Sequence, residues 1–95
     1  MADDDEPHEL PLEDALDLHT FAPRDVASVV EEYLTACAEA GMTEVRVIHG
    51  KGIGVQRRIV ESVLAKLPFV VEHRPADEWR GGWGATIVKL RAPTE

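Results

Sequence analysis

Three glycines at alternate positions, with a lysine between two of them, form the stretch of this chain best suited to chemistry. They lie in segment 49–54, HGKGIG, between an apolar run at 45–48 and a helical pattern that begins at Val55. Glycine lets the backbone approach a ligand closely, and a helix N-terminus offers unpaired N–H groups and a positive dipole end. We therefore interpret this turn as a phosphate site formed by His49, Gly50, Lys51, Gly52 and Gly54.

Two common nucleotide motifs do not fit this turn. A dinucleotide fingerprint requires a third glycine where Val55 stands, and a Walker loop requires Ser or Thr after the lysine, where Gly52 stands. The alternative to a phosphate site is a plain strand-to-helix turn, which needs only one glycine. Arg57 and Arg58 lie in the first turns of the following helix, and we expect one of them to point toward the glycine turn and the other to be solvated.

Asp17 and His19 form a second candidate pair. At a spacing of two residues they project from the same face of a strand. Such a pair can activate a water molecule, hold a divalent metal through Asp17, or move a proton at a phosphate. The alternative is a solvated polar face. His49 ends the next strand, so we expect it to lie near His19, but the ligand spacing does not support structural zinc.

A glycine-rich aromatic segment, WRGGWG at 79–84, is the third candidate. Glycines beside aromatic residues and an arginine make a loop that can stack on a base and contact a phosphate. We assign this role to Gly82, Trp83 and Gly84 and expect the Trp83 side chain to be exposed. For Trp79 we favour the alternative, in which the indole caps the core.

Periodicity predicts the elements that position these three groups. Apolar spacing predicts helices that begin at Pro23 and Val55, while alternating or β-branched runs predict strands at 15–19, 44–49, 69–74 and 85–90. Strands joined by helices are expected to run parallel through right-handed crossovers. The predicted fold is a two-layer α/β sandwich in β-α-β-α-β-β order, with a four-stranded mixed sheet and both helices on one face.

Composition indicates one small globular domain. The chain has 95 residues, of which 44% are hydrophobic, and no apolar run approaches the length needed to span a bilayer. The single Cys37 lies on the apolar face of the first helix and fits a reducing compartment. We expect an acidic tail at 1–10 without fixed structure, a domain at 11–92, a cytoplasmic location without a signal peptide or membrane contact, and a monomer.

The charge is distributed unevenly. The net charge is −8, but the first 14 residues hold seven acids and no Lys or Arg. From Arg46 to Arg91 there are nine bases and four acids, and the glycine motifs lie in this basic portion. This distribution favours a local phosphate site over strong non-specific binding to DNA.

Together these motifs resemble those of the Smr (small MutS-related) domain family. The resemblance runs from Leu16 to about Leu90 and rests on LDLH at 16–19, HGKGIG at 49–54 with Arg57, and GWGATIV at 82–88. Thr20 stands where the family has a glycine. The resemblance implies a fold like the C-terminal domain of bacterial translation initiation factor three, binding of DNA or RNA, and nicking or endonuclease activity in many members.

The sequence therefore predicts a nucleic-acid-binding Smr domain that is a candidate endonuclease, with Asp17 and His19 as catalytic residues. Asp17 would orient or deprotonate a water, directly or through Mg²⁺ or Mn²⁺, and His19 would act as acid or base. One alternative is a module that binds nucleic acid without cleaving it. Another is a protein-interaction domain in which the acidic tail and the first helix contact a basic partner.

Overall fold

The structure, a computed structural model, describes residues 12–50, 54–80 and 82–91, with the backbone alone described at Arg80 and Trp83. Its main elements are β1 (Ala15–Asp17), α1 (Pro23–Glu39), β2 (Glu44–Ile48), α2 (Val55–Lys66), β3 (Val70–Pro75) and β4 (Ala85–Leu90). Two 3₁₀ turns, η1 (Glu78–Arg80) and η2 (Gly82–Gly84), lie between β3 and β4. The predicted β-α-β-α-β-β order is confirmed, while the acidic tail at 1–10 lies outside the described residues.

The four strands form one mixed sheet in the order β1-β2-β4-β3. β1 pairs with β2 in parallel, and β4 pairs antiparallel with both β2 and β3. Consequently β1, β2 and β3 all run in the same direction, as predicted for strands that helices connect. Their C-terminal ends, together with the N-terminal end of β4, share one edge of the fold.

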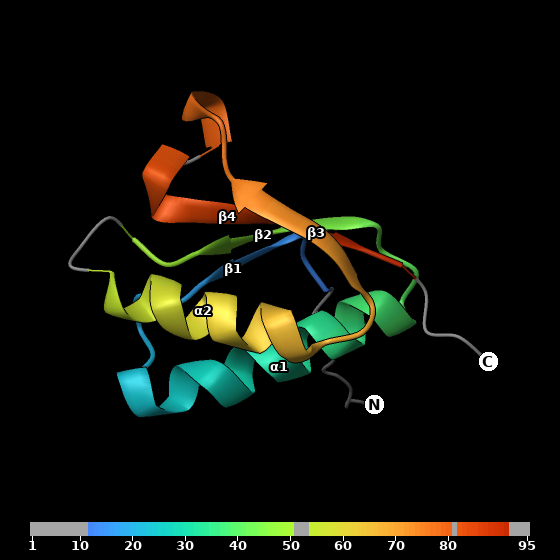
Figure 1. Ribbon diagram of the computed structural model, residues 1–95, viewed down its shortest axis with the longest axis horizontal. Helices are drawn as coiled ribbons and strands as arrows, with labels where there is room; N and C mark the ends of the chain where they lie inside the picture. Colours follow the sequence, from blue (N-terminus) through green and yellow to red (C-terminus); the bar gives the residue numbers. More distant parts are fainter. Residues whose placement is uncertain (1–11, 51–53, 81, 92–95) are drawn as a thin grey trace, which may run out of the picture.

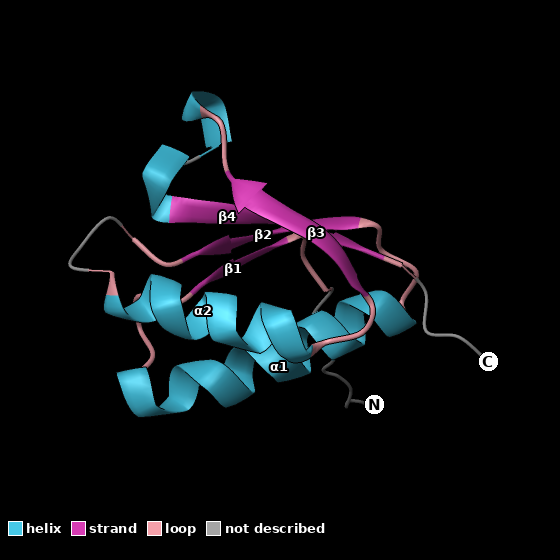
Figure 2. Cartoon of the chain, in the orientation of Figure 1, coloured by secondary structure: helices cyan, strands magenta, loops and turns pink. Residues whose placement is uncertain are grey.

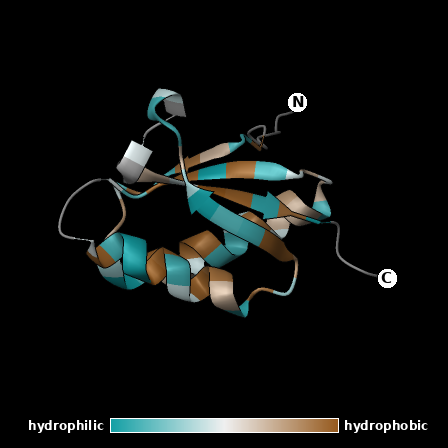
Figure 3. Ribbon diagram, turned by 45° about the horizontal axis from the view of Figure 1, so that its top comes forward, coloured by the Kyte–Doolittle hydropathy of each residue, from teal (hydrophilic) through white to brown (hydrophobic). Residues whose placement is uncertain are grey.

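Both helices cover the same face of the sheet, which gives the predicted two layers (Figures 1 and 2). Hydrophobic and hydrophilic residues alternate along the strands because only one face packs against the helices (Figure 3). The buried residues of this interface come from α1, β2, α2 and β4, together with Leu18 just after β1. They are Leu18, Val26, Val30, Leu34, Cys37, Val45, Val47, Val60, Val63, Leu64, Val88 and Leu90. A smaller apolar cluster of Ala76, Ala85 and Ile87 contains residues of the opposite face.

The first helix follows its sequence pattern closely. Pro23 occupies a first-turn position, where its missing N–H is not needed, and Val26, Val30 and Leu34 are fully buried. Gly41 has a φ of 84° just after the helix, a conformation that glycine adopts without strain. Cys37 is buried as predicted, and burial raises the pKa of its thiol. Within the described ranges no helix is long and apolar enough to cross a membrane.

Two strands end earlier than predicted, and both corrections concern the candidate site. β1 ends at Asp17 rather than at residue 19, because after Leu18 donates its N–H to the Ile48 carbonyl (2.9 Å) the chain turns toward α1. β2 ends at Ile48, because the next two amides leave the strand ladder and donate to Gly84. The polar residues His19 and His49 therefore lie at turns rather than within the sheet.

Candidate nucleic-acid interface

Hydrogen bonds bring the first two motifs together at one end of the sheet. Asp17 is the register partner of Ile48, and the Leu18 N–H donates to the Ile48 carbonyl over 2.9 Å. The Asp17–His19 pair therefore follows β1 where the glycine turn follows β2. This is the arrangement that motifs sharing one phosphate require.

The third motif is joined to the glycine turn through a single carbonyl. The Gly84 oxygen accepts hydrogen bonds from the N–H groups of His49 (2.9 Å) and Gly50 (2.8 Å). The end of η2 is thereby fixed against the start of the turn. All three motifs thus meet at the same end of the sheet, although the first and the last are separated by about sixty residues of sequence.

The two described glycines of the turn have left-handed backbones. Gly50 has a φ of 83° and Gly54, which caps α2, has a φ of 89°. A Cβ added at either position would meet nothing within 4 Å, so the backbone conformation rather than crowding favours glycine here. Lys51 and Gly52, which we predicted to contact phosphate, lie outside the described residues.

Asp17 and His19 contact each other directly. The backbone N–H of His19 donates to Asp17 Oδ1 over 3.0 Å, and the ring nitrogen Nδ1 lies 2.9 Å from the same oxygen. These two bonds hold the pKa of the Asp17 carboxyl below its usual value. Because an ionised carboxylate only accepts, Nδ1 carries the proton, and a neutral His19 ring keeps its lone pair on Nε2. The His19 side chain is 76% exposed, so solvent and substrate can reach it.

His49 has a different environment from His19. Its side chain is buried, with Nδ1 lying 3.1 Å from the Gly50 carbonyl and Nε2 lying 2.9 Å from Thr86 Oγ1. Since a carbonyl only accepts, Nδ1 donates to it, and in the neutral ring Nε2 accepts from the Thr86 hydroxyl. A contact between the His49 ring and a phosphate would break one of these bonds. The geometry gives His49 the task of fixing the first residue of the glycine turn.

Arg57 borders a small hollow beside the glycine turn. The hollow has a volume of about 170 Å³ and is lined by residues of α2, β3 and β4 together with His49. Arg57 Nε donates to Glu61 Oε2 over 3.4 Å, in an exposed pair of the kind that contributes roughly 0–1 kcal/mol. The same hollow includes His73 and Arg74, which the sequence reasoning overlooked because β3 carries no recognisable motif.

The aromatic segment differs from the prediction at Trp79. We expected its indole to cap the core, but this is wrong, since Trp79 is 91% exposed on η1. The helix-facing core is formed by other side chains, and η1 projects away from it (Figure 1). Gly82 has a φ of 53° and begins η2, while the side chain of Trp83 lies outside what the structure describes.

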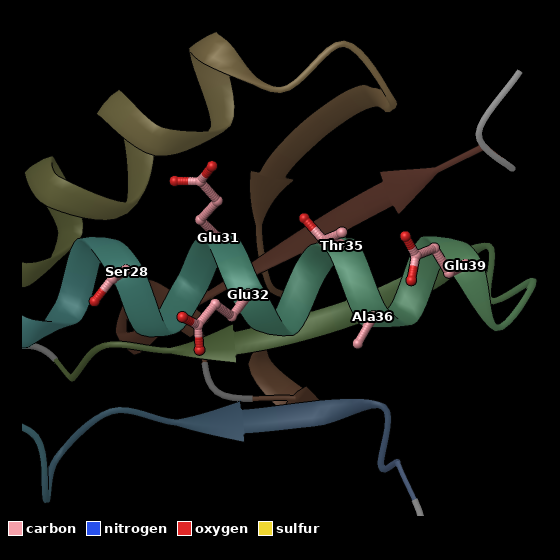
Figure 4. Close-up of a pocket in the computed structure, with 6 residues that line it drawn as sticks. All are labelled: Ser28, Glu31, Glu32, Thr35, Ala36 and Glu39. Carbon is pink, nitrogen blue, oxygen red and sulfur yellow. The ribbon is translucent and has the colours of Figure 1, made fainter.

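A second hollow lies on the solvent side of α1 and has the opposite charge. It has a volume of about 430 Å³ and is lined by residues that include Glu31, Glu32 and Glu39 (Figure 4). Three carboxylates and no base among its lining residues disfavour a phosphate there. The charge of this hollow is therefore opposite to the charge that a phosphate site needs.

The donor set for a metal is limited. Within the described residues no group of three or more His, Cys, Asp or Glu side chains is placed to hold a metal ion. Asp17 offers one exposed carboxylate. That fits Mg²⁺ or Mn²⁺ only in the mode where the ion keeps several waters and takes further oxygens from substrate phosphates.

Comparisons with known proteins agree with this arrangement. A family model described as the Smr domain matches residues 16–91. Endonuclease MutS2 of Clostridium perfringens (strain SM101) is 34% identical over 80 residues, which cover 84% of this chain and 10% of that protein. The chain thus spans about a tenth of the length of the curated relatives it matches.

Two solved structures share the fold. The crystal structure of the Smr domain of Thermus thermophilus MutS2 is 28% identical, with a TM-score of 0.77 over 83% of this chain and 99% of that one. YdaL, a stand-alone small MutS-related protein from Escherichia coli, is also 28% identical, with a TM-score of 0.72 over 85% of this chain and 66% of that one. The match to the family model includes all three motifs of the candidate site. The chain belongs to the Smr domain family.

Proposed function

We propose that this domain binds DNA or RNA at the end of its sheet and hydrolyses a phosphodiester bond there. The observation that carries the proposal is the convergence of the three motifs through the hydrogen bonds of Leu18, His49 and Gly50. The name of the MutS2 relatives, endonuclease, agrees with such an activity.

In the proposed reaction, His19 moves the proton. Its Nε2 takes a proton from a water molecule while the water oxygen bonds to phosphorus, and the bond from phosphorus to the departing sugar oxygen breaks. The protonated ring or solvent then supplies the proton that this oxygen needs. Asp17 orients the ring through Nδ1 and stabilises the positive charge that the ring acquires.

Backbone groups of the glycine turn and nearby basic side chains would hold the phosphate. Gly50 and Gly54 shape the turn, the N-terminus of α2 contributes its dipole, and we assign charge neutralisation to Lys51 and Arg57. We also keep Gly52, Gly82, Trp83 and Gly84 as proposed contacts. When Mg²⁺ or Mn²⁺ is bound through Asp17, it would polarise the phosphate oxygens.

Cleavage assays on supercoiled plasmid, branched DNA and structured RNA, each with and without Mg²⁺ or Mn²⁺, test the proposal. His19→Ala should lose roughly 10²–10⁴-fold in the single-turnover rate, which is the usual contribution of a general acid or base. Glu39→Gln, an acid at the far end of α1, is the matched control and should cleave at the wild-type rate. A fully active His19→Ala protein would refute the assignment.

A second function has its own motivation. Thr20, which follows the catalytic pair, stands where the family has a glycine. Thr20 adds an exposed side chain next to His19 that a glycine would lack. On this second proposal the domain binds nucleic acid and recruits another factor without cleaving. Binding without cleavage under every metal condition would establish this function, and Thr20→Gly would be the first variant expected to gain activity.

A further inference from the structure

Trp79 is exposed to solvent on a connection that two backbone hydrogen bonds hold in place. The Ala76 N–H donates to the Ala85 carbonyl over 3.0 Å, which closes the base of the loop, and the Gly82 N–H donates to the Asp77 carbonyl over 2.9 Å, which closes its tip. With an exposure of 91%, the indole gains nothing from burial where it stands. The Trp79 indole is therefore a large, flat apolar surface that is accessible to a binding partner.

The same loop is anchored in the candidate site. Its last residue, Gly84, accepts the two hydrogen bonds from the glycine turn described above. The connection rises from the sheet on the side away from α1 and α2 (Figure 1). A ligand that reaches the site from the uncovered face of the sheet would consequently pass Trp79.

Strand register places two arginines on that uncovered face. Arg46 and Arg74 are both register partners of Ile87, one on each side of it. Register partners project to the same face of a sheet, so both arginines flank Ile87, which belongs to the apolar cluster opposite the helices. Arg74 lies on the edge strand β3, where it also borders the hollow beside Arg57. Asp17 lies in the neighbouring row, since its partner Ile48 is opposite Ala85.

The charges on this face favour one orientation of a nucleic acid. The row that contains Arg46 and Arg74 is next to the candidate site. In the following row the positive charge of Lys89 is offset by two carboxylates, Glu44, whose Oε1 lies 3.9 Å from Lys89 Nζ, and Glu72. Asp77 and Glu78 precede Trp79 in the sequence, and the exposed indole offers a surface to an uncharged base. Phosphates therefore fit over the arginine row, and a base fits on the loop.

We propose that Trp79 and the uncovered sheet face hold a single-stranded segment next to the phosphate to be cleaved, with the indole stacked on an unpaired base and Arg74 contacting the backbone of the nucleic acid. This inference rests on the proposed function and narrows its substrate class to nucleic acid with unpaired nucleotides. A base that is paired and stacked within a duplex does not present its face to an indole.

Binding measurements on single-stranded and fully paired oligonucleotides of equal length test the inference. Trp79→Ala should weaken binding of the single strand by roughly 5- to 100-fold, which corresponds to the usual contribution of one aromatic stack, and should leave duplex binding within about twofold. Trp79→Phe should restore most of the affinity, because a phenyl ring also stacks. Val71→Ala is the matched control, since Val71 is an exposed apolar residue (59%) on β3 away from the loop.

Arg74 provides an independent measurement. Arg74→Ala should reduce by about 0.7 the slope of log affinity against log salt for the single strand, as expected when one phosphate contact is lost. Lys66→Ala removes a positive charge from the opposite end of α2 and should leave this slope unchanged.

The outcomes distinguish failure of this inference from failure of the proposed function. If the wild type binds no oligonucleotide, the proposed function fails and this inference fails with it. If the wild type binds and Trp79→Ala binds the single strand equally well, only this inference fails and the proposed function stands. Equal losses on single strand and duplex would also overturn it, because stacking would not select unpaired bases.

Discussion

The buried hydrogen bond between the His49 and Thr86 side chains offers the sharpest test of what stabilises the start of the glycine turn. Thr86→Val keeps the shape of the side chain but removes the hydroxyl that lies 2.9 Å from His49 Nε2. Both side chains are nearly buried, at 7% and 5% exposure, so water cannot readily replace the lost partner. The variant should therefore leave one ring nitrogen of His49 buried and unsatisfied.

The expected cost follows from this burial. Leaving a buried polar group without a partner costs about 1–3 kcal/mol, which in a domain of this size lowers the melting temperature by roughly 4–24 °C. Because Val has the volume of Thr, no cavity adds to this cost. Affinity for nucleic acid should fall as well, since His49 also holds the Gly50 carbonyl at the start of the glycine turn.

Urea denaturation monitored by circular dichroism measures the change in the free energy of unfolding. An unchanged m value would show that the surface exposed on unfolding is the same in the variant and the wild type. Thr86→Ser retains the hydroxyl and should lie closer to the wild type than Thr86→Val does. A Thr86→Val protein as stable as the wild type would refute the reasoning, because the bond would then contribute nothing to the fold.

Three further predictions follow from the charges. Lys51→Ala should weaken binding of nucleic acid without lowering the melting temperature. Asp17→Ala should leave binding unchanged and abolish cleavage, because a carboxylate facing a phosphate does not stabilise the bound ground state. Equilibrium binding and single-turnover rates, measured for both variants, distinguish these effects. Deleting residues 1–10 should tighten binding at low salt by removing negative charge, as salt titrations can show. Finally, stability contributed by Asp17 is complete above its unfolded pKa near 3.8 and disappears as pH falls through the lower folded value, so Asp17→Asn should lack this acid-dependent loss.

The helices and the strand order along the chain could be predicted because their signals are local. The buried positions of α1 and α2 repeat every three to four residues, and Pro23 and Gly41 mark the two ends of α1. The position of β4 between β2 and β3 could not be predicted this way, because pairing between distant strands leaves no periodic trace in either of them.

The candidate site was likewise predictable only in part. Glycines at 50 and 54 signalled special backbone conformations, and both have a positive φ. The pairing of His49 with Thr86 spans 37 residues and becomes visible only when β2 and β4 are side by side. The exposure of Trp79 was also hidden, because a tryptophan between charged residues and glycines reads equally well as a core cap or as a surface residue.

The central place of β4 has a consequence for how the domain comes to be assembled. During synthesis the glycine turn and the Asp17–His19 pair leave the ribosome well before Gly84 and the strand that follows it. Until β4 inserts, β2 and β3 have no antiparallel neighbour, and the amides of His49 and Gly50 have no Gly84 carbonyl to meet. Such long-range pairing is slow compared with helix formation. The candidate site would therefore be incomplete in a nascent domain until β4 has joined the sheet, and the proposed cleavage would require that pairing first.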